Sequence, residues 1–275
     1  MIGFYIITHC RNHNDHLLLE RCIQSIKNIY QDGQIIIVDD NSSIPLNVNE
    51  KIICNPEYNG SGEILPYLIN FRQRYFEYYI VMHDSMVLKK KLPDDVDECA
   101  FLWKFTLYKS DVHTLGKKFK KIIYNLPDRK KIYSYYLSGK CTDSDSRKCQ
   151  CHLCGGCLCK QCVSSLISIK KNQVYWNGCF GVTMLVKQKF MDTLFMKYKL
   201  EKIYPLVKTR DDRSCCERLF GILCYIEKGQ NCLSLNGDIH NYPDAFVTGD
   251  FLYLNDILEK HKYANMYVLK TWVGR

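Results

Sequence analysis

The most informative stretch for the fold is Ile35-Ile36-Ile37-Val38-Asp39-Asp40-Asn41-Ser42. Its β-branched half predicts a buried strand, and its polar half predicts a turn that ends the strand abruptly. Two carboxylates at the end of a buried strand are costly unless they bind something. A carboxylate at this place can accept hydrogen bonds from a nucleobase N–H or a ribose hydroxyl. The alternative is an ordinary strand-to-loop turn, which often uses Asp and Asn.

Similar segments lie on either side of this stretch. Short apolar runs predict strands at 4–8, 51–54 and 78–82, and apolar spacing predicts helices ending near 29 and 74. This order of elements predicts an α/β fold with a mostly parallel sheet flanked by helices. Such sheets bind ligands beyond the carboxyl ends of their strands. The polar residues that predict a nucleotide site there are Thr8, His9, Arg11, Asp39, Asp40, His83 and Asp84.

The composition is that of a globular protein that can form its own core. The chain has 275 residues, of which 47% are hydrophobic and 24% are charged. No stretch has the roughly 18 apolar residues of a membrane helix. The first residues lack the basic region and cleavage site of a signal peptide, so we expect a cytoplasmic protein. The net charge of +9 weakly favours anionic partners, and the abundance of Lys, Ile, Asn and Tyr indicates an AT-rich genome, such as that of a large virus or a parasite.

Four motifs follow one another along the chain: Thr8-His9-Cys10-Arg11-Asn12, Val38-Asp39-Asp40-Asn41-Ser42, Asn55-Pro56-Glu57-Tyr58-Asn59-Gly60 and His83-Asp84-Ser85. In this order they resemble a family 2-type glycosyltransferase with the Rossmann-like GT-A fold. The resemblance covers residues 3–90 well and resumes near 174–228. It implies a hexosyltransferase-like enzyme that moves a sugar, with inversion, from a nucleotide-sugar such as a UDP-sugar to a hydroxyl of a glycan, protein or lipid acceptor.

The resemblance also implies roles for the residues of the donor side. Asp39 would contact the nucleobase and Asp40 the ribose. Thr8 and Arg11 would line the nucleotide pocket.

A divalent cation, Mn²⁺ or Mg²⁺, is the cofactor that the resemblance implies at the sugar diphosphate. Asp84 would hold it, because such ions take oxygen ligands from carboxylates and phosphates. His83 and Ser85 replace the outer carboxylates of the family's Asp-x-Asp motif, and His83 can serve with Mn²⁺. His240 or Asp238 would supply the missing ligand from late in the chain.

The acceptor side also has counterparts in the family. Trp176, Gly178 and Gly181 match an aromatic-Gly-x-x-Gly segment, although Trp176 can equally be a core residue. Further along, Asp211-Asp212 and Arg218, six residues after Asp212, match the segment that opens the family's helix with the catalytic base. Asp212 would then be the general base that takes the proton of the acceptor hydroxyl. Asp211 would lie beside this base, Glu217 is the alternative base, and Arg218 would contact the donor diphosphate. The other interpretation is that Asp211-Asp212 simply caps the N-terminus of a helix.

Residues 141–162 are rich in cysteine, and we expect them to form an insertion in the fold. The pattern Cys149-x-Cys151-x-x-Cys154 recurs as Cys157-x-Cys159-x-x-Cys162. Paired short spacings let thiolates converge on a tetrahedral ion, which predicts a structural Zn²⁺ site. Disulfides or free thiols remain the alternatives, and the choice of four ligands stays open.

We expect one GT-A-like domain over 1–275, with a nucleotide-sugar-binding half at 1–98 and an acceptor-binding half at 99–275. A rival hypothesis is a zinc-containing nucleic-acid-binding protein that uses the basic stretch 104–131. The strand-end carboxylates would repel a phosphate backbone, so we do not expect nucleic acid as a partner. An amphipathic helix that buries Phe119, Ile122 and Ile123 explains the basic stretch better. A catalytically inactive GT-A binding module is a third hypothesis.

Overall fold

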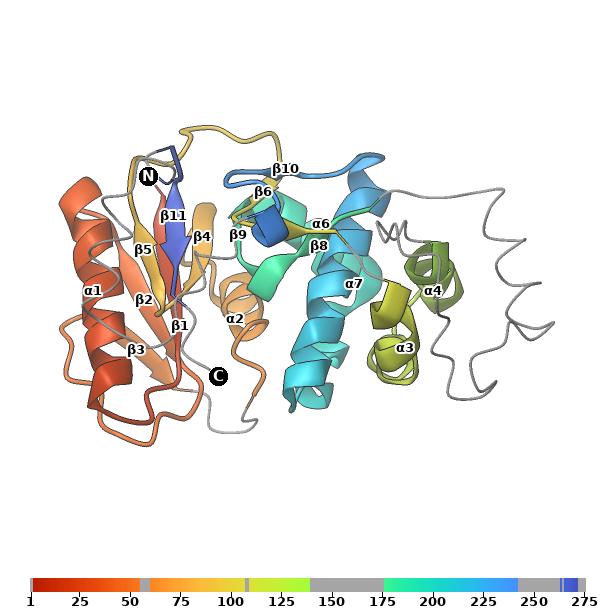
Figure 1. The fold of residues 1–275 in the computed structure, drawn as a ribbon, viewed down its shortest axis with the longest axis horizontal. Coiled ribbons are helices and arrows are strands. Elements are labelled where there is room, and N and C mark those ends of the chain that lie inside the picture. The colour runs from red at the N-terminus through yellow and green to blue at the C-terminus, as the bar shows by residue number, and fades with distance from the viewer. Residues whose placement is uncertain are drawn as a thin grey trace.

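The centre of the structure, a computed structural model, is a seven-stranded sheet with the order β10-β6-β9-β4-β1-β2-β3 (Figure 1). The structure describes residues 2–54, 60–106, 109–138, 176–241, 263 and 265–271. The strands of the sheet are β1 (Gly3–Thr8), β2 (Ile35–Asp39), β3 (Lys51–Cys54), β4 (Tyr78–His83), β6 (Cys99–Phe101), β9 (Met184–Lys187) and β10 (Leu233–Ser234). Two small sheets pair β5 (Met86–Leu88) with β11 (Val268–Lys270) and β7 (Lys104–Phe105) with β8 (Gly178–Cys179).

The first four strands of the chain run parallel, as the alternation of strands and helices predicts. β1 pairs with β2 and with β4, and β2 pairs with β3. Every residue of β1 is buried, because the strand is covered on both faces. β9 joins β4 and β6 in antiparallel register. The prediction of an α/β fold with a mostly parallel sheet is therefore confirmed.

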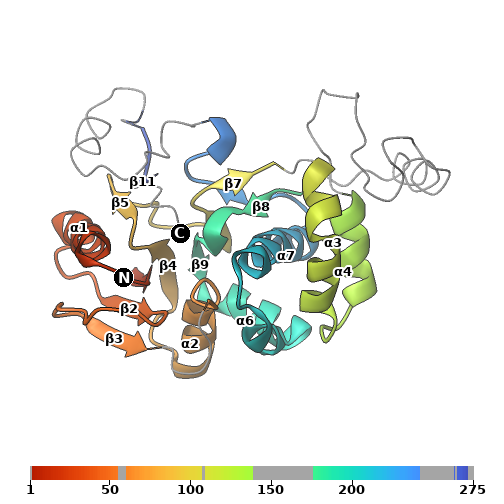
Figure 2. The ribbon, with the colours of Figure 1, turned by 60° about the horizontal axis from the view of Figure 1, so that its bottom comes forward.

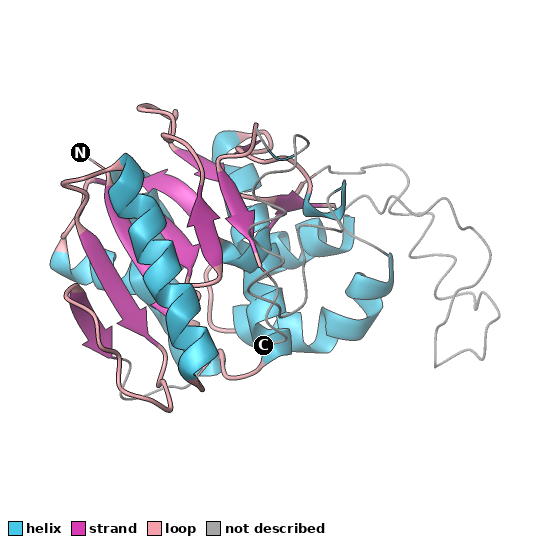
Figure 3. Ribbon diagram, turned by 60° about the vertical axis from the view of Figure 1, so that its left-hand side comes forward, coloured by secondary structure: helices cyan, strands magenta, loops and turns pink. Residues whose placement is uncertain are grey.

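Helices cover both faces of this sheet (Figures 2 and 3). α1 lies across one face, while α2 and α6 lie next to each other on the other. α7 packs along β8, and α3 and α4 contact α7. The helices are α1 (His13–Ile29), α2 (Leu65–Gln73), α3 (Lys109–Ile123), α4 (Arg129–Ser138), α6 (Gln188–Tyr198) and α7 (Arg210–Lys228), with short 3-10 turns η1 (Phe180–Val182), η2 (Leu200–Lys202), η3 (Tyr204–Leu206) and η4 (Ile239–Asn241).

The pairing of β5 with β11 brings the last described strand back to the carboxyl end of β4. Lys270 lies opposite Met86 in antiparallel register. The backbone N–H of Thr271 donates to the Ser85 carbonyl at 2.8 Å. Residues just after β4 are thereby joined to a strand more than 180 positions later in the chain.

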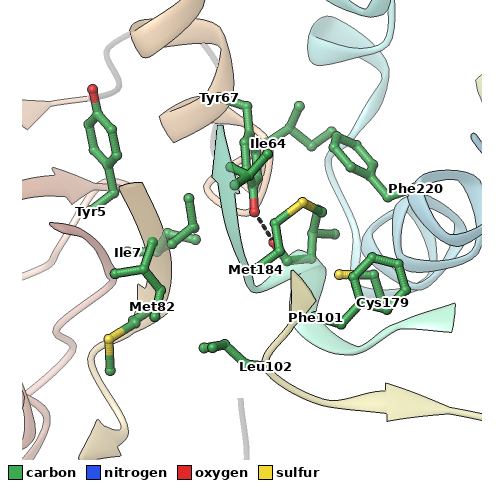
Figure 4. Packing of buried hydrophobic residues seen from close by; sticks show 14 of the residues in the cluster. Tyr5, Ile7, Ile64, Tyr67, Met82, Phe101, Leu102, Cys179, Met184 and Phe220 are labelled. Atoms are coloured by element: carbon green, nitrogen blue, oxygen red, sulfur yellow. Dashed lines mark hydrogen bonds between the residues drawn. The ribbon is translucent and has the colours of Figure 1, made fainter. Parts of the chain in front are cut away.

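Aromatic side chains join the sheet to α7 (Figure 4). Tyr67 on α2 is fully buried, and its hydroxyl donates to the Val182 carbonyl in η1. Its ring centroid lies 5.4 Å from that of Phe220 on α7. Phe101 and Met184 belong to the same core cluster. This packing holds η1 between the sheet and α7.

Helix α3 buries the apolar positions that its pattern predicts, Phe119, Ile122 and Ile123, each at most 3% exposed. The lysines between them are exposed, as on a solvated helix surface. None of the helices in the described ranges is long and apolar enough to cross a membrane. The predicted Cys-rich insertion at 141–162 and residues 55–59 of the third motif lie outside the described residues.

Candidate active site

A cavity of about 550 Å³ lies beyond the carboxyl ends of β1, β2 and β4. β2 and β4 flank β1 on opposite sides, so the order of the strands reverses at this point. Open parallel sheets bind their ligands at such a switch point. Five basic and four acidic side chains line the cavity: Arg11, Lys208, Arg210, Arg213 and Lys270, together with Asp40, Glu63, Asp84 and Glu217.

Two predicted donor-site residues, Thr8 and Asp84, are bonded to each other at the switch point. The Thr8 hydroxyl donates to Asp84 Oδ2 at 2.7 Å, and the Asp84 N–H donates to the Ile7 carbonyl at 2.9 Å. Thr8 and Asp84 are only 1% and 3% exposed. A buried carboxylate is tolerated only when it is hydrogen-bonded, so Thr8 fixes the Asp84 carboxylate in the cavity wall.

The two carboxylates that follow β2 have different partners. Asp40 lines the cavity, and its carboxylate accepts the backbone N–H groups of Gly60 and Gly62 at 3.0 and 3.2 Å. Gly60 has a φ of +98°, and a Cβ there would lie 2.7 Å from a backbone oxygen, so this loop requires glycine. Asp39 accepts the N–H and hydroxyl of Ser42 at 2.9 and 2.6 Å. Asp39 therefore stabilises the turn after β2 and is not among the residues that line the cavity.

Beside the cavity, the backbone of Gly181 in η1 forms hydrogen bonds with one residue of β4 and one residue of α7. Its carbonyl lies 3.0 Å from His83 Nε2, and its N–H donates to Glu217 Oε1 at 2.7 Å. Because a carbonyl only accepts, we assign the imidazole proton to Nε2. His83 Nδ1 then accepts from the Lys270 ammonium at 3.0 Å. These contacts orient the His83 ring and the Glu217 carboxylate together.

Glu217 is a largely buried carboxyl whose pKa is raised toward neutral pH. Burial and the neighbouring Glu63 carboxylate raise the pKa of Glu217 to about 8, against the opposing charges of Arg218 and Lys270. Burial also raises the pKa of Glu63, whose Oε2 is buried without a hydrogen-bond partner; Arg213 Nε lies 3.9 Å from its other oxygen. A carboxyl that titrates near neutral pH can take and return a proton. Carboxyls shifted in this way within a cavity mark candidate functional residues.

The first two turns of α7 bring cationic groups to the same cavity. Arg210, Arg213, Ser214 and Glu217 line it, a spacing that places them on one face of the helix. Lys208 lines the cavity from just before the helix. The N-terminal end of a helix also carries a partial positive charge and backbone N–H donors. This end of the cavity therefore favours an anion.

Asp212 and Asp211, the predicted base and its neighbour, have other partners at the start of α7. The Asp212 carboxylate accepts the N–H and the hydroxyl of Thr209 at 2.9 and 2.8 Å, within a capping box. Asp211 forms an ion pair with Lys118 on α3. Neither residue lines the cavity. Their placement matches the helix-cap interpretation of this acidic pair.

Four further predicted site residues lie outside the cavity lining. Trp176 is buried, and its indole N–H donates to a backbone carbonyl of α4 at 2.8 Å. A Cβ on Gly178 would collide with the ring of Phe105. The buried Arg218 guanidinium lies 4.9 Å from the centroid of that ring. His240 Nδ1 is 3.2 Å from the carboxylate of Asp238, and its ring centroid lies 6.4 Å from that of Phe105.

The cavity thus gathers part of the predicted site: Thr8, His9, Arg11, Asp40, His83, Asp84, Gly181 and Glu217. Among the three carboxylates to which the resemblance gives the main roles, Asp84 lines the cavity, whereas Asp39 and Asp212 do not. Sequence reasoning missed several lining residues: Glu63, Phe180, Lys208, Arg210, Arg213 and Lys270. Three of these, Glu63, Lys208 and Lys270, lie in loops or in a late strand that carries no motif. Phe180 lies in η1, and Arg210 and Arg213 directly flank the acidic pair at the start of α7.

The side chains present do not assemble the predicted site for a divalent cation. Both His83 nitrogens have partners, Gly181 and Lys270, and His240 lies outside the cavity. Among the described residues, three ligand atoms from His, Cys, Asp or Glu converge within 4.8 Å only at a group of cysteines elsewhere. Of the predicted ligands, only Asp84 and His83 line the cavity.

That group of cysteines comprises Cys99 on β6, Cys224 on α7 and Cys232 just before β10, all buried. Hydrogen bonds from the Cys224 and Cys99 thiols, with the charge of Lys228, lower the pKa of Cys232 to about 5. Three converging thiols can hold a soft ion such as Zn²⁺ or Cu⁺. Their wide separation in the sequence forms no motif, so sequence reasoning did not find them.

Neither a protein-family model nor a curated protein matches this sequence. Among solved structures, the chain is similar to galactosyltransferase LgtC in complex with donor and acceptor sugar analogues, at 10% identity and a TM-score of 0.37, over 100% of this chain and 87% of that one. It is also similar to an active-site mutant of LgtC (10%, TM-score 0.36, 100% and 88%) and to mouse xyloside xylosyltransferase 1 in its apo form (8%, TM-score 0.37, 97% and 96%). These likenesses are too distant to assign an activity, a donor or an acceptor to this chain.

Proposed function

We propose that this protein is a nucleotide-sugar-dependent glycosyltransferase. The observation that carries the proposal is a single cavity, at the switch point of a parallel sheet, where basic side chains and a desolvated carboxyl, Glu217, face the same space. The basic groups suit the diphosphate of an activated sugar, and the carboxyl suits removal of a proton from an acceptor hydroxyl. The motifs at Thr8–Asn12 and Val38–Ser42, which resemble those of GT-A enzymes, contribute residues to this cavity.

Glu217 acts as the general base in this proposal. The acceptor oxygen attacks the anomeric carbon as the bond from that carbon to the diphosphate breaks. The diphosphate leaves with the electron pair, and the hydroxyl proton passes to the Glu217 carboxylate. The N–H of Gly181 orients that carboxylate. We favour Glu217 over Asp212 because the Asp212 carboxylate is already bonded within the capping box.

The chemistry of the cavity wall supports one orientation of the donor. The nucleoside lies at the ends of β1 and β2, near Thr8, Arg11 and Asp40, and the diphosphate lies toward the start of α7. The Phe180 ring, which lines the cavity, offers an apolar face to a sugar. A UDP-sugar is our first candidate donor, and a glycan, protein or lipid hydroxyl is the acceptor. The cysteines at 149–162 would hold a structural zinc ion and order a loop near the acceptor side.

A screen of UDP- and GDP-sugars by thermal shift tests the binding half of this proposal. A donor present at about 100 times its Kd should stabilise the protein by about 2.7 kcal/mol. A DNA duplex in the same screen tests the nucleic-acid hypothesis. Stabilisation by DNA with no response to any nucleotide sugar would refute the glycosyltransferase proposal.

Measuring how fast the bound donor is turned over tests the catalytic part of the proposal. Glu217→Gln should bind the donor normally but lower kcat by about 100-fold or more, because the amide cannot accept the proton. Glu201→Gln, an exposed carboxylate in η2, is the matched control and should retain activity. If the wild-type protein binds nucleotide sugars but releases no nucleoside diphosphate with any acceptor or with water, it is a binding module and not an enzyme.

A further inference from the structure

The Lys270 ammonium lies beside the His83 ring, where a metal ion bound to His83 would have to lie. Its ammonium lies 3.0 Å from His83 Nδ1 and 5.6 Å from the centroid of the Phe180 ring. Lys270 is only 8% exposed, and it lines the same cavity as Asp84. A cationic group therefore lies directly against the histidine of the His83-Asp84-Ser85 motif.

This contact excludes His83 as a metal ligand in the arrangement that the structure shows. A metal ion needs the lone pair of a neutral imidazole nitrogen. Nε2 carries the proton that is donated to the Gly181 carbonyl, so Nδ1 holds the one available lone pair. The Lys270 ammonium already donates to it. One lone pair cannot serve a proton donor and a metal ion at the same time.

The backbone fixes Lys270 in this position. β11 pairs with β5, which places Lys270 opposite Met86, directly after the motif. The next residue, Thr271, donates its N–H to the Ser85 carbonyl at 2.8 Å. The lysine therefore reaches the cavity from a paired strand and not from an exposed loop, and its position is set by the fold.

We propose that Lys270, together with Arg213, holds the diphosphate of the donor, and that the enzyme needs no divalent cation there. This inference rests on the proposed function and identifies how the site binds its substrate. Both side chains line the cavity, Arg213 from α7 and Lys270 from β11. The two cations would contact the diphosphate from two different elements.

The proposal is chemically sufficient for the transfer step. As the bond between the anomeric carbon and the phosphate oxygen breaks, that oxygen takes the electron pair and gains negative charge. Charge-assisted hydrogen bonds from an ammonium and a guanidinium can stabilise such an oxygen, more strongly in a cavity than in water. The proton of the acceptor goes to Glu217, so the cations neither gain nor lose one.

Binding of inorganic pyrophosphate, measured by calorimetry in EDTA and in Mn²⁺, tests the inference without depending on the nucleoside or the acceptor. We expect binding in EDTA with less than about a twofold change on adding Mn²⁺. Lys270→Met should weaken it by about 10- to 100-fold, as expected for the loss of a charge-assisted hydrogen bond, and Lys270→Arg should restore most of it. Lys187→Met removes a half-exposed lysine that pairs with Asp95 outside the cavity, and it should bind as wild type does.

The outcomes separate this inference from the proposed function. Pyrophosphate binding that requires Mn²⁺, or that survives Lys270→Met unchanged in EDTA, would overturn the role of Lys270 and leave glycosyl transfer intact. Pyrophosphate binding in EDTA without turnover of any nucleotide sugar would support the diphosphate site and refute the enzyme. Binding of neither pyrophosphate nor a nucleotide sugar, in either condition, would overturn both. The same calorimetry on folded Lys270→Met, verified by its thermal transition, excludes misfolding as the cause of a loss.

Discussion

Glu217→Gln should make the protein more stable, and increasingly so as the pH rises. The pKa of Glu217 is about 8 in the folded chain, where burial and the Glu63 carboxylate raise it, against 4.5 for an ordinary glutamate. The folded state thus binds this proton more tightly than the unfolded state does. The stability that the proton contributes is complete below about pH 4.5 and is lost as the pH rises through about 8. Glutamine has no such proton to lose.

The size of the effect follows from the shift, because one pKa unit corresponds to about 1.36 kcal/mol. Between pH 5 and pH 7.5 the variant should gain about 3 kcal/mol of unfolding free energy relative to wild type. The group is 15% exposed, so solvent screens it little. Urea unfolding of both proteins at several pH values measures the difference, with Glu201→Gln as the control for the loss of one negative charge. A Glu217→Gln difference that stays constant from pH 5 to 7.5 would show that this carboxyl is not desolvated.

Two other variants and one control variant test the local geometry. Asp212→Asn should lower the unfolding free energy by about 1 kcal/mol, because it weakens the capping box. Its kcat should stay within about twofold of the wild-type value. A loss of activity with full donor binding would show that Asp212 is the base after all. Gly181→Ala should destabilise the protein by about 1–2 kcal/mol, since φ is +59° and the new Cβ would lie 3.0 Å from the His83 ring. As a control in α3, Gly116→Ala would bring its new Cβ no closer than 3.9 Å to the Tyr133 hydroxyl, an ordinary contact, and should be neutral or stabilising by at most about 1 kcal/mol.

The strands of the first half of the chain could be predicted because their signals are local. The run Ile35–Val38 is β-branched, and the polar residues after it can only form a turn. A parallel sheet then brings the ends of β1, β2 and β4 to one edge, so that Thr8, Asp40 and Asp84 share a cavity. That part of the site follows from the order of the elements alone.

The other wall of the cavity could not be predicted because its residues come from pairings that span most of the chain. Lys270 reaches the site only because β11 pairs with β5, and β11 is a three-residue strand without a motif around it. Glu63 precedes α2, and nothing in its neighbours indicates that its Oε2 atom is buried. Long-range contacts of this kind leave no periodic pattern in the sequence.

The choice between Asp212 and Glu217 as the base depends on helix geometry, which the motif alone does not show. A helix turns by about 100° per residue, so two residues five positions apart point about 140° away from each other. Only one of these carboxylates can therefore face a cavity beside α7. Arg210, Arg213 and Ser214 line the cavity, and their spacing from Glu217 of seven, four and three residues places Glu217 on their face. Asp212 instead points back to the N-cap Thr209, where its carboxylate stabilises the start of the helix that carries Glu217.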